Sequence, residues 1–185
     1  MKIRDLEFED DSIKTQVAEM LVSGFSDMSP DSWPNVRVAM EEVEESFSPG
    51  RISVVAMEGR RALGWCAAIR QYNGNTFELH PLVVHKDHRR SGVGAALVGE
   101  IESRVIQTGA LTLWLATDDE SGATSLFGQD LYPDPIKHLN AIRNINRHPY
   151  EFYEKLGFVR CGVLPDANGF GKPDIFMSKR VRKIN

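Results

Sequence analysis

The most informative stretch of the sequence runs from Leu82 to Gly94 and reads LVVHKDHRRSGVG. An apolar run ends there in a basic turn that contains glycine, and the turn opens an amphipathic helix over 92–107. Such a turn aims backbone N–H groups at one point, and the helix N-terminus adds a partial positive charge. Because glycine has no Cβ, an anion can approach the main chain closely at Gly92 and Gly94. The stretch predicts a binding site for a pyrophosphate or another anion, and a turn without ligand is the alternative.

Two common phosphate loops are excluded by their spacing. The pattern Gly-x-x-x-x-Gly-Lys-Ser/Thr is absent, because Gly171-Lys172 lacks the earlier glycine and Pro173 follows it. The pattern Gly-x-Gly-x-x-Gly needs a third glycine where the chain has Leu97.

Outward from this turn, apolar periodicity and turn residues predict the other elements. Helices are expected over 12–25, 36–47, 92–107, 136–145 and 150–156. Strands are expected over 51–57, 62–71, 76–84, 111–116, 158–164 and 174–179, with a hairpin at Asn73-Gly74-Asn75. This order predicts a mixed α/β (α+β) fold, a single domain over residues 1–185, and a mostly antiparallel central sheet flanked by helices.

Composition narrows the class of protein. The chain has 185 residues and a net charge of −4, which argues against nucleic acid and suits a cationic substrate. No apolar run is long enough to cross a membrane or to serve as a signal peptide. Cys66 and Cys161 lie in apolar runs, which indicates buried thiols in a reducing compartment, the cytoplasm.

Two motifs carry a resemblance to a known family. Arg89-x-x-Gly92-x-Gly94 resembles the acetyl-CoA pyrophosphate signature of the GNAT superfamily, Arg/Gln-x-x-Gly-x-Gly/Ala. The run from Asn146 to Phe158 is similar to the GNAT pattern Asn-x-x-Ala-x-x-x-Tyr-x-Lys-x-Gly-Phe, with Pro149 in place of the alanine. Together the motifs favour an acetyltransferase over a turn without ligand.

A narrower resemblance, to the aminoglycoside 6′-N-acetyltransferases, covers most of the chain. Its runs are 33–34, 78–84, 117–119, 130–132, 148–158, 165–169 and 171–175. The resemblance implies acetyl-CoA as co-substrate, direct transfer of acetyl to a primary amine in a ternary complex, no metal, and a homodimer. Two alternatives stay open: the acceptor is a polyamine or a protein amine, or the chain is an acyl-CoA-binding module without activity.

The resemblance also implies which residues hold acetyl-CoA. They are Leu82, Val83, Val84, Arg89, Arg90, Ser91, Gly92, Val93, Gly94, Ala95, Asn146 and Tyr153. Pro81 removes a donor from the strand, and the family likeness implies a β-bulge there that splays two strands apart. The Leu82 N–H is then expected to bond the thioester oxygen.

Catalysis is assigned to Glu78, Leu82 and Tyr153. Tyr153 is expected to protonate the leaving thiolate, since a phenol with a pKa of about 10 is protonated at neutral pH. In a strand, Glu78 and His80 point to the same face as Leu82. Glu78 is expected to accept the proton of the amine, directly or through water, or only to bind the cationic substrate.

Substrate binding is assigned to Trp33, Glu78, His80, Asp118 and Asp119. The acids Asp118 and Asp119 follow a strand, where α/β sheets place their ligand loops. A solvated loop is the alternative for them, and core packing is the alternative for Trp33. Glu41, Glu42, Glu44 and Glu45 are expected on the exposed face of a helix, with substrate binding as the alternative.

Overall fold

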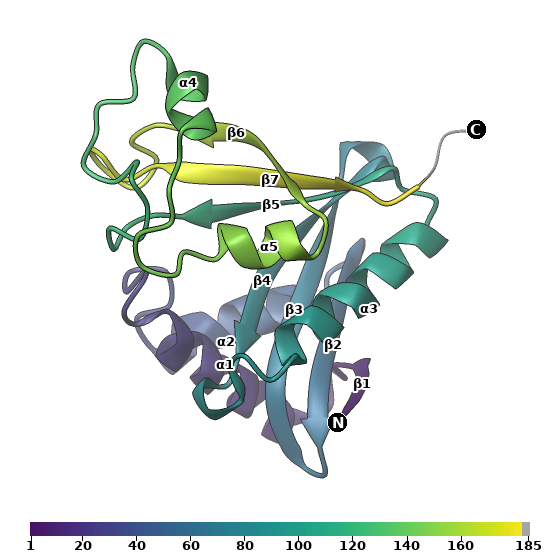
Figure 1. The fold of residues 1–185 in the computed structure, drawn as a ribbon. Helices are drawn as coiled ribbons and strands as arrows, with labels where there is room; N and C mark the ends of the chain where they lie inside the picture. Colours follow the sequence, from purple (N-terminus) through teal and green to yellow (C-terminus); the bar gives the residue numbers. More distant parts are fainter. Residues whose placement is uncertain (183–185) are drawn as a thin grey trace. The chain divides into compact units, whose positions relative to one another are not determined.

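A computed structural model describes residues 1–182 of the chain (Figure 1). The chain forms two compact units. The first runs from Met1 to Leu113 and takes in the chain end from Val181, and the second runs from Trp114 to Arg180. Both units contain helices and strands, which confirms the predicted mixed α/β class. One domain over residues 1–185 stays a prediction.

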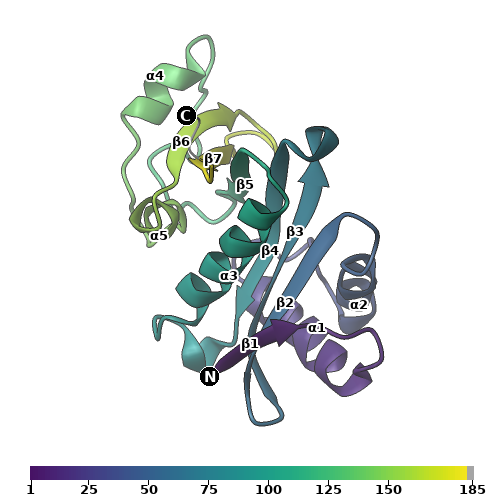
Figure 2. The same cartoon turned by 90° about the vertical axis from the view of Figure 1, so that its right-hand side faces the viewer.

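The first unit is a four-stranded antiparallel sheet between helices. Its strands β1 (Lys2–Asp5), β2 (Arg51–Glu58), β3 (Arg61–Gln71) and β4 (Thr76–Val84) follow each other in space as in sequence. Helices α1 (Asp11–Phe25) and α2 (Val36–Glu45) lie on one face, and α3 (Val93–Gln107) lies on the other (Figure 2). Because both faces are covered, β3 is buried without interruption over 62–68.

Local signals explain where these helices begin. The Asp10 side chain caps α1 by accepting from the Ile13 N–H at 3.2 Å. Asn35 caps α2 in the same way, through the Val38 N–H at 3.1 Å. Helix α1 therefore begins at Asp11, one residue before the expected start at 12.

The hairpin between β3 and β4 is confirmed, and one strand was missed. Gln71 pairs with Thr76 across a short 3-10 turn, η1 (Tyr72–Gly74), in which Asn73 has φ 57 and Gly74 has φ 88. Strand β1 was not predicted, because its four residues, KIRD, show no apolar alternation. Pairing with β2 makes it a strand.

The second unit contains β5 (Thr112–Asp118) from Trp114 on, β6 (Val159–Leu164) and β7 (Asp174–Arg180), in the order β5-β7-β6. Helix α5 (Tyr150–Lys155) contacts β6 and β7, and α4 (Pro135–Asn140) contacts β6. The expected helix over 136–145 ends earlier, because Asn144 forms a β-bridge with Thr124.

Only one of the two cysteines is buried. Cys66 lies inside β3, where burial raises the pKa of its thiol. Cys161 is exposed, so the expectation of a buried thiol is wrong there. Its apolar neighbours belong to β6, which is the outer strand in the order β5-β7-β6. No residue of β6 is fully buried, because the strand has a neighbour on one side only.

Candidate active site

The predicted anion site is the turn between β4 and α3. A short 3-10 turn, η2 (Lys86–His88), follows β4, and the main chain then takes positive φ at Arg90 (63°) and at Gly92 (91°). A Cβ at Gly92 would meet nothing within 4 Å, so this position favours glycine for its backbone conformation and not for packing. Gly92 is the N-cap of α3, and no side chain of the described residues caps the helix there.

This helix end suits a phosphate group. The first amide N–H groups of a helix have no acceptor inside it, and the helix dipole favours negative charge there. The open space above Gly92 leaves the main chain accessible to an anion. The residues present therefore fit the pyrophosphate of acetyl-CoA, with the amides of Gly92 to Ala95 as its donors.

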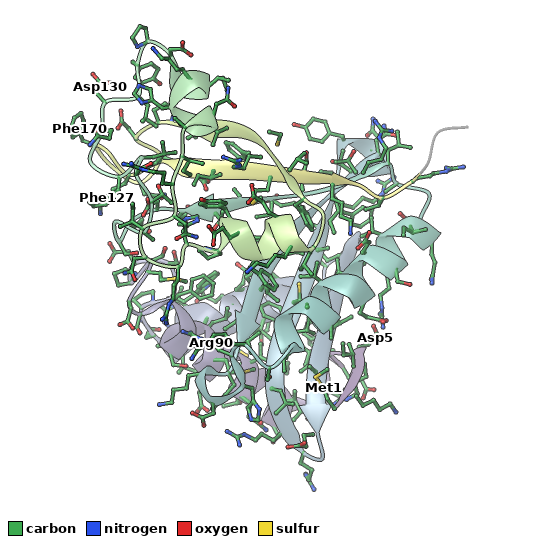
Figure 3. The ribbon with its side chains drawn as sticks, in the orientation of Figure 1. Met1, Asp5, Arg90, Phe127, Asp130 and Phe170 are labelled. Atoms are coloured by element: carbon green, nitrogen blue, oxygen red, sulfur yellow. The ribbon has the colours of Figure 1, made fainter. Side chains whose placement is uncertain are left out.

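Two side chains of the turn shape it. The Arg89 guanidinium donates to the Gly24 carbonyl at 3.1 Å and to the Val84 carbonyl at 3.4 Å. The Ser91 hydroxyl donates to the His88 carbonyl at 2.6 Å. Arg90 is exposed (Figure 3). Direct contacts of these three side chains with a phosphate stay predictions. Arg89 and Ser91 already donate to main-chain carbonyl groups, so a phosphate would have to share or replace those hydrogen bonds.

A bulge interrupts the pairing of β4 where Pro81 predicts it. Cys66 pairs with Leu82, and Ala68 pairs with Leu79. Between these two pairs, β4 therefore advances by three residues while β3 advances by two, which is a β-bulge in β4. Val83 on the far side is buried in the core, which leaves only its main chain for a ligand. The bulge is confirmed, and the contact of the Leu82 N–H with a thioester stays a prediction.

Glu78, His80 and Leu82 share the predicted face of β4. All three are half-buried, and the residues between them are buried. The Gln71 side-chain amide donates to the Glu78 carboxylate at 3.3 Å. Trp33 lies against this face, with its ring centroid 6.1 Å from that of His80. The structure thus brings three of the expected substrate residues together: Trp33, Glu78 and His80.

Trp33 is also part of the core. Its exposed fraction is 9%, and its ring packs edge-on against Phe25 with centroids 4.6 Å apart. The core-packing alternative is therefore the role that the structure shows. Stacking on a sugar ring stays a prediction.

Glu42 was expected on the exposed face of α2, and this is wrong. Its side chain is 17% exposed, and its carboxylate lies 3.9 Å from the His80 Nε2 and 3.6 Å from the Arg51 guanidinium. Glu42 lies three residues after Ala39 and four before Ser46, which are both buried. That helical spacing is the signal that could have placed it inward.

The charges of Glu42 and His80 depend on each other. Burial alone would raise the pKa of Glu42, but the adjacent His80 and Arg51 lower it below its usual value. Burial alone would lower the pKa of His80, but the carboxylates of Glu42 and Glu78 raise it above its usual value, against Arg51. The cluster therefore favours a charged imidazole beside ionised acids.

In the second unit, Asp118 and Asp119 at the end of β5 have different surroundings. Asp119 is completely buried, and its carboxylate accepts from the Ala123 N–H at 2.7 Å, the Thr124 N–H at 2.8 Å and the Thr124 hydroxyl at 2.6 Å. It holds the loop that follows the strand. Substrate binding by Asp119 stays a prediction, and its carboxylate could reach a substrate only by giving up these bonds.

Asp118 is exposed and is positioned by two residues without an assigned role. The Asn168 amide donates to its carboxylate at 3.0 Å, and the His148 Nε2 lies 3.0 Å from its carbonyl. The His148 Nδ1 accepts from the Tyr150 N–H at 3.2 Å, which assigns the ring proton to Nε2. Burial lowers the pKa of His148, against the attraction of Asp118 and Asp119, so the ring is neutral.

Tyr153 lies on α5 as its motif predicts. It is buried, and its ring packs edge-on against Phe152 and Phe158, with centroids 5.0 and 5.6 Å apart. Gly157 ends the helix with φ 88, as expected of the residue after its last turn. Asn146 donates its N–H to the Ala123 carbonyl at 3.0 Å. The roles of Tyr153 and Asn146 toward acetyl-CoA stay predictions.

No helix within residues 1–182 is long and apolar enough to cross a membrane. In the same part of the chain, no three residues of the types His, Cys, Asp and Glu form a group that could hold a metal ion.

The chain is similar to three solved enzymes. An aminoglycoside 6′-N-acetyltransferase complexed with coenzyme A is 38% identical over 100% of this chain and 99% of that one, with a TM-score of 0.92. The aminoglycoside 6′-N-acetyltransferase from Enterococcus faecium is 38% identical over 100% and 99% of the two chains, with a TM-score of 0.88. An aminoglycoside 6′-acetyltransferase type Ii is 34% identical over 100% of both, with a TM-score of 0.76.

A search of the curated proteins found no match. The family model described as acetyltransferase (GNAT) family matches residues 16–131, which include β4, the basic turn and all of α3. The motifs, the fold and the identity to solved acetyltransferases agree with this match. The chain belongs to the GNAT family of acetyltransferases.

Proposed function

We propose that the protein transfers the acetyl group of acetyl-CoA to the 6′-amine of an aminoglycoside. The observation that carries this proposal is the 38% identity, along the full chain, to an aminoglycoside 6′-N-acetyltransferase complexed with coenzyme A. Acids support it in each unit taken by itself, because an aminoglycoside is polycationic: Glu42 and Glu78 lie in the first unit, and Asp118 lies in the second.

Each predicted residue has a distinct task in this function. Acetyl-CoA supplies a thioester whose acetyl group is open to attack by a neutral amine. The amides at the start of α3 bind its pyrophosphate. The Leu82 N–H polarises the carbonyl, as a donor aimed at the charge that develops on its oxygen. Glu78 takes a proton from the ammonium of the acceptor, directly or through water, and Tyr153 gives its phenol proton to the leaving thiolate. The second proton that the nitrogen loses on becoming an amide restores the Tyr153 phenol, directly or through water.

The acceptor is tested by measuring release of the CoA thiol from acetyl-CoA with kanamycin, tobramycin, spermidine and a lysine peptide. We expect turnover only with the aminoglycosides, and mass spectrometry of the product should place the acetyl group at the 6′ position. Turnover only with spermidine or the peptide would replace the proposed acceptor by a polyamine or a protein amine. Tight acetyl-CoA binding without release would favour the binding-module alternative.

The role of Tyr153 is tested by Tyr153→Phe. The variant keeps the ring packing but loses the proton donor, so we expect kcat to fall by about a hundredfold with little change in acetyl-CoA affinity. An unchanged kcat would remove Tyr153 as the acid.

The role of the turn is tested by Gly92→Asp. It places a carboxylate where the phosphates are expected and strains the backbone at φ 91. We expect acetyl-CoA affinity to fall by more than about tenfold in calorimetry. Gly92→Ala brings the strain without the charge and is the matched control; equal losses in both variants would assign the effect to strain alone.

We also propose that the protein is a cytoplasmic homodimer that protects a bacterium against aminoglycosides. The resemblance to the aminoglycoside enzymes supports the dimer and the protection, and the two free cysteines suit a reducing compartment. Light scattering on the purified protein should give twice the mass of one chain. Expression in a susceptible strain should raise the inhibitory concentration of kanamycin.

A further inference from the structure

Glu42 and His80 come from different elements and meet inside the first unit. Glu42 stands on α2 and His80 on β4, and the Glu42 Oε2 lies 3.9 Å from the His80 Nε2. This is longer than the 2.7–3.2 Å of an ordinary hydrogen bond, so the contact is an ion pair when the imidazole is protonated. The His80 ring also lies beside the ring of Trp33, with centroids 6.1 Å apart.

Arg51 of β2 forms an ion pair with the other carboxylate oxygen of Glu42. Its guanidinium lies 3.6 Å from the Glu42 Oε1, and it also pairs with Glu45 on the next turn of α2. The Glu42 Oε1 and the Arg51 Nη1 are buried, and neither finds a hydrogen-bond partner among the described residues. The carboxylate of Glu42 is therefore oriented by charge, with its second oxygen directed at His80.

The charged groups of the first unit that act on His80 come from three elements. They are Glu42 from α2, Glu78 from β4 and Arg51 from β2. The two acids outweigh the arginine and the effect of burial, and raise the pKa of His80. The imidazole thus keeps its proton to higher pH than a free histidine does, on the same strand face as Glu78, to which we have assigned the acceptor amine.

We propose that Glu42 is a positioning residue for acetyl transfer: it acts through His80, which it holds between Trp33 and Glu78, and so controls how strongly the site attracts a cationic acceptor. The inference rests on the proposed function, because it assumes an amine acceptor beside Glu78. A protonated His80 competes with the ammonium group of the acceptor for the same carboxylates. When His80 loses its proton, the site becomes more negative and the KM for the acceptor falls.

The first experiment follows the His80 ring by NMR in the wild-type protein and in Glu42→Gln. The five histidines are told apart with His80→Asn, whose spectrum lacks the signal of interest. We expect the midpoint of the His80 titration to move to lower pH in Glu42→Gln, because one of the two acids that favour the charged ring is lost. Glu41→Gln is the matched control, since Glu41 is on the same helix, 62% exposed, and pairs with Arg37.

The second experiment measures kcat and KM for kanamycin against pH in the same proteins. In Glu42→Gln the fall of KM with rising pH should shift to lower pH, and KM at high pH should rise by about fivefold, with a smaller change in kcat. Glu42→Asp retains the charge and should restore most of the wild-type profile. Circular dichroism and melting curves establish that each variant is folded.

Failure of this inference differs from failure of the proposed function. If the wild-type protein acetylates kanamycin but Glu42→Gln has the wild-type titration of His80 and the wild-type pH profile, Glu42 is not a positioning residue. If the wild-type protein acetylates none of the amines, the proposed function fails. The NMR midpoint then still decides whether Glu42 controls His80, and an unmoved midpoint overturns the inference.

Discussion

Glu42 of the first unit interacts with charged side chains, whereas Asp118 and Asp119 of the second unit accept hydrogen bonds from neutral donors. Glu42 lies between Arg51 and His80, which are both basic groups. Asp119 accepts from two amide N–H groups and one hydroxyl, and Asp118 accepts from the Asn168 amide. Charged neighbours couple the ionisation of Glu42 to that of His80. Neutral donors hold a carboxylate in place without adding a second group that titrates.

This difference teaches that a carboxylate near a strand end is not by itself a substrate ligand. Asp118 and Asp119 are neighbours in sequence, yet one is exposed and the other is completely buried. The buried residue builds the loop, and the exposed one is presented by it. Three predictions test this contrast, from the largest effect to the smallest.

Asp119→Ala should have the largest effect on stability. It leaves the Ala123 and Thr124 amides and the Thr124 hydroxyl without their buried acceptor, which should lower the free energy of unfolding by about 3 kcal/mol. Urea denaturation followed by circular dichroism measures it. Asp118→Ala is the control and should cost less than about 1 kcal/mol, since it loses one exposed hydrogen bond. Equal losses for the two variants would erase the contrast.

Asp118→Asn should act on the acceptor and not on the fold. The exposed carboxylate becomes neutral, so we expect KM for kanamycin to rise by about tenfold with an unchanged free energy of unfolding. Initial rates at saturating acetyl-CoA measure it. A wild-type KM would show that Asp118 binds no acceptor.

The smallest effect is the pH dependence of the Glu42–His80 pair. The raised pKa of His80 stabilises the fold fully below about pH 6.5, and this is lost as the pH rises through the folded pKa. The lowered pKa of Glu42 stabilises it above about pH 4.5, and this is lost as the pH falls through the folded pKa. Both contributions are therefore complete only near pH 5–6.5.

Glu42→Gln should consequently destabilise the protein more at pH 6 than at pH 8.5. Because the His80 side chain is 43% exposed, solvent screening should keep the difference below about 1 kcal/mol. Urea denaturation at the two pH values measures it. A larger loss for Glu42→Gln at pH 8.5 would contradict the assignment to His80.

The pH dependence of stability due to His148 has the opposite sign. Its lowered pKa means that the unfolded chain binds the proton more readily, so the contribution of His148 to the free energy of unfolding is lost as the pH falls below about 6.5.

Much of this protein is determined by local sequence. The turn into α3 depends on Gly92, which has a positive φ. Glycine adopts this backbone conformation without steric cost whatever the surrounding structure is. The hairpin at Asn73-Gly74, the break of pairing at Pro81 and the helix end at Gly157 likewise follow from backbone preferences of single residues. These features were predictable because their causes lie within a few residues.

Other features depend on the tertiary structure: the presence of β1, the end of α4, and which carboxylates turn inward. Strand β1 exists because β2 lies beside it, and α4 ends early because Asn144 bridges to Thr124. Glu42 turns inward because it meets two basic groups there, His80 from a distant part of the chain and Arg51 from the following strand. Asp119 turns inward because the loop after it folds back and places its N–H groups against the carboxylate. A carboxylate is stable in either setting, since its free energy depends on the partners that it finds and not on its own conformation. Those partners become known only when the chain has folded.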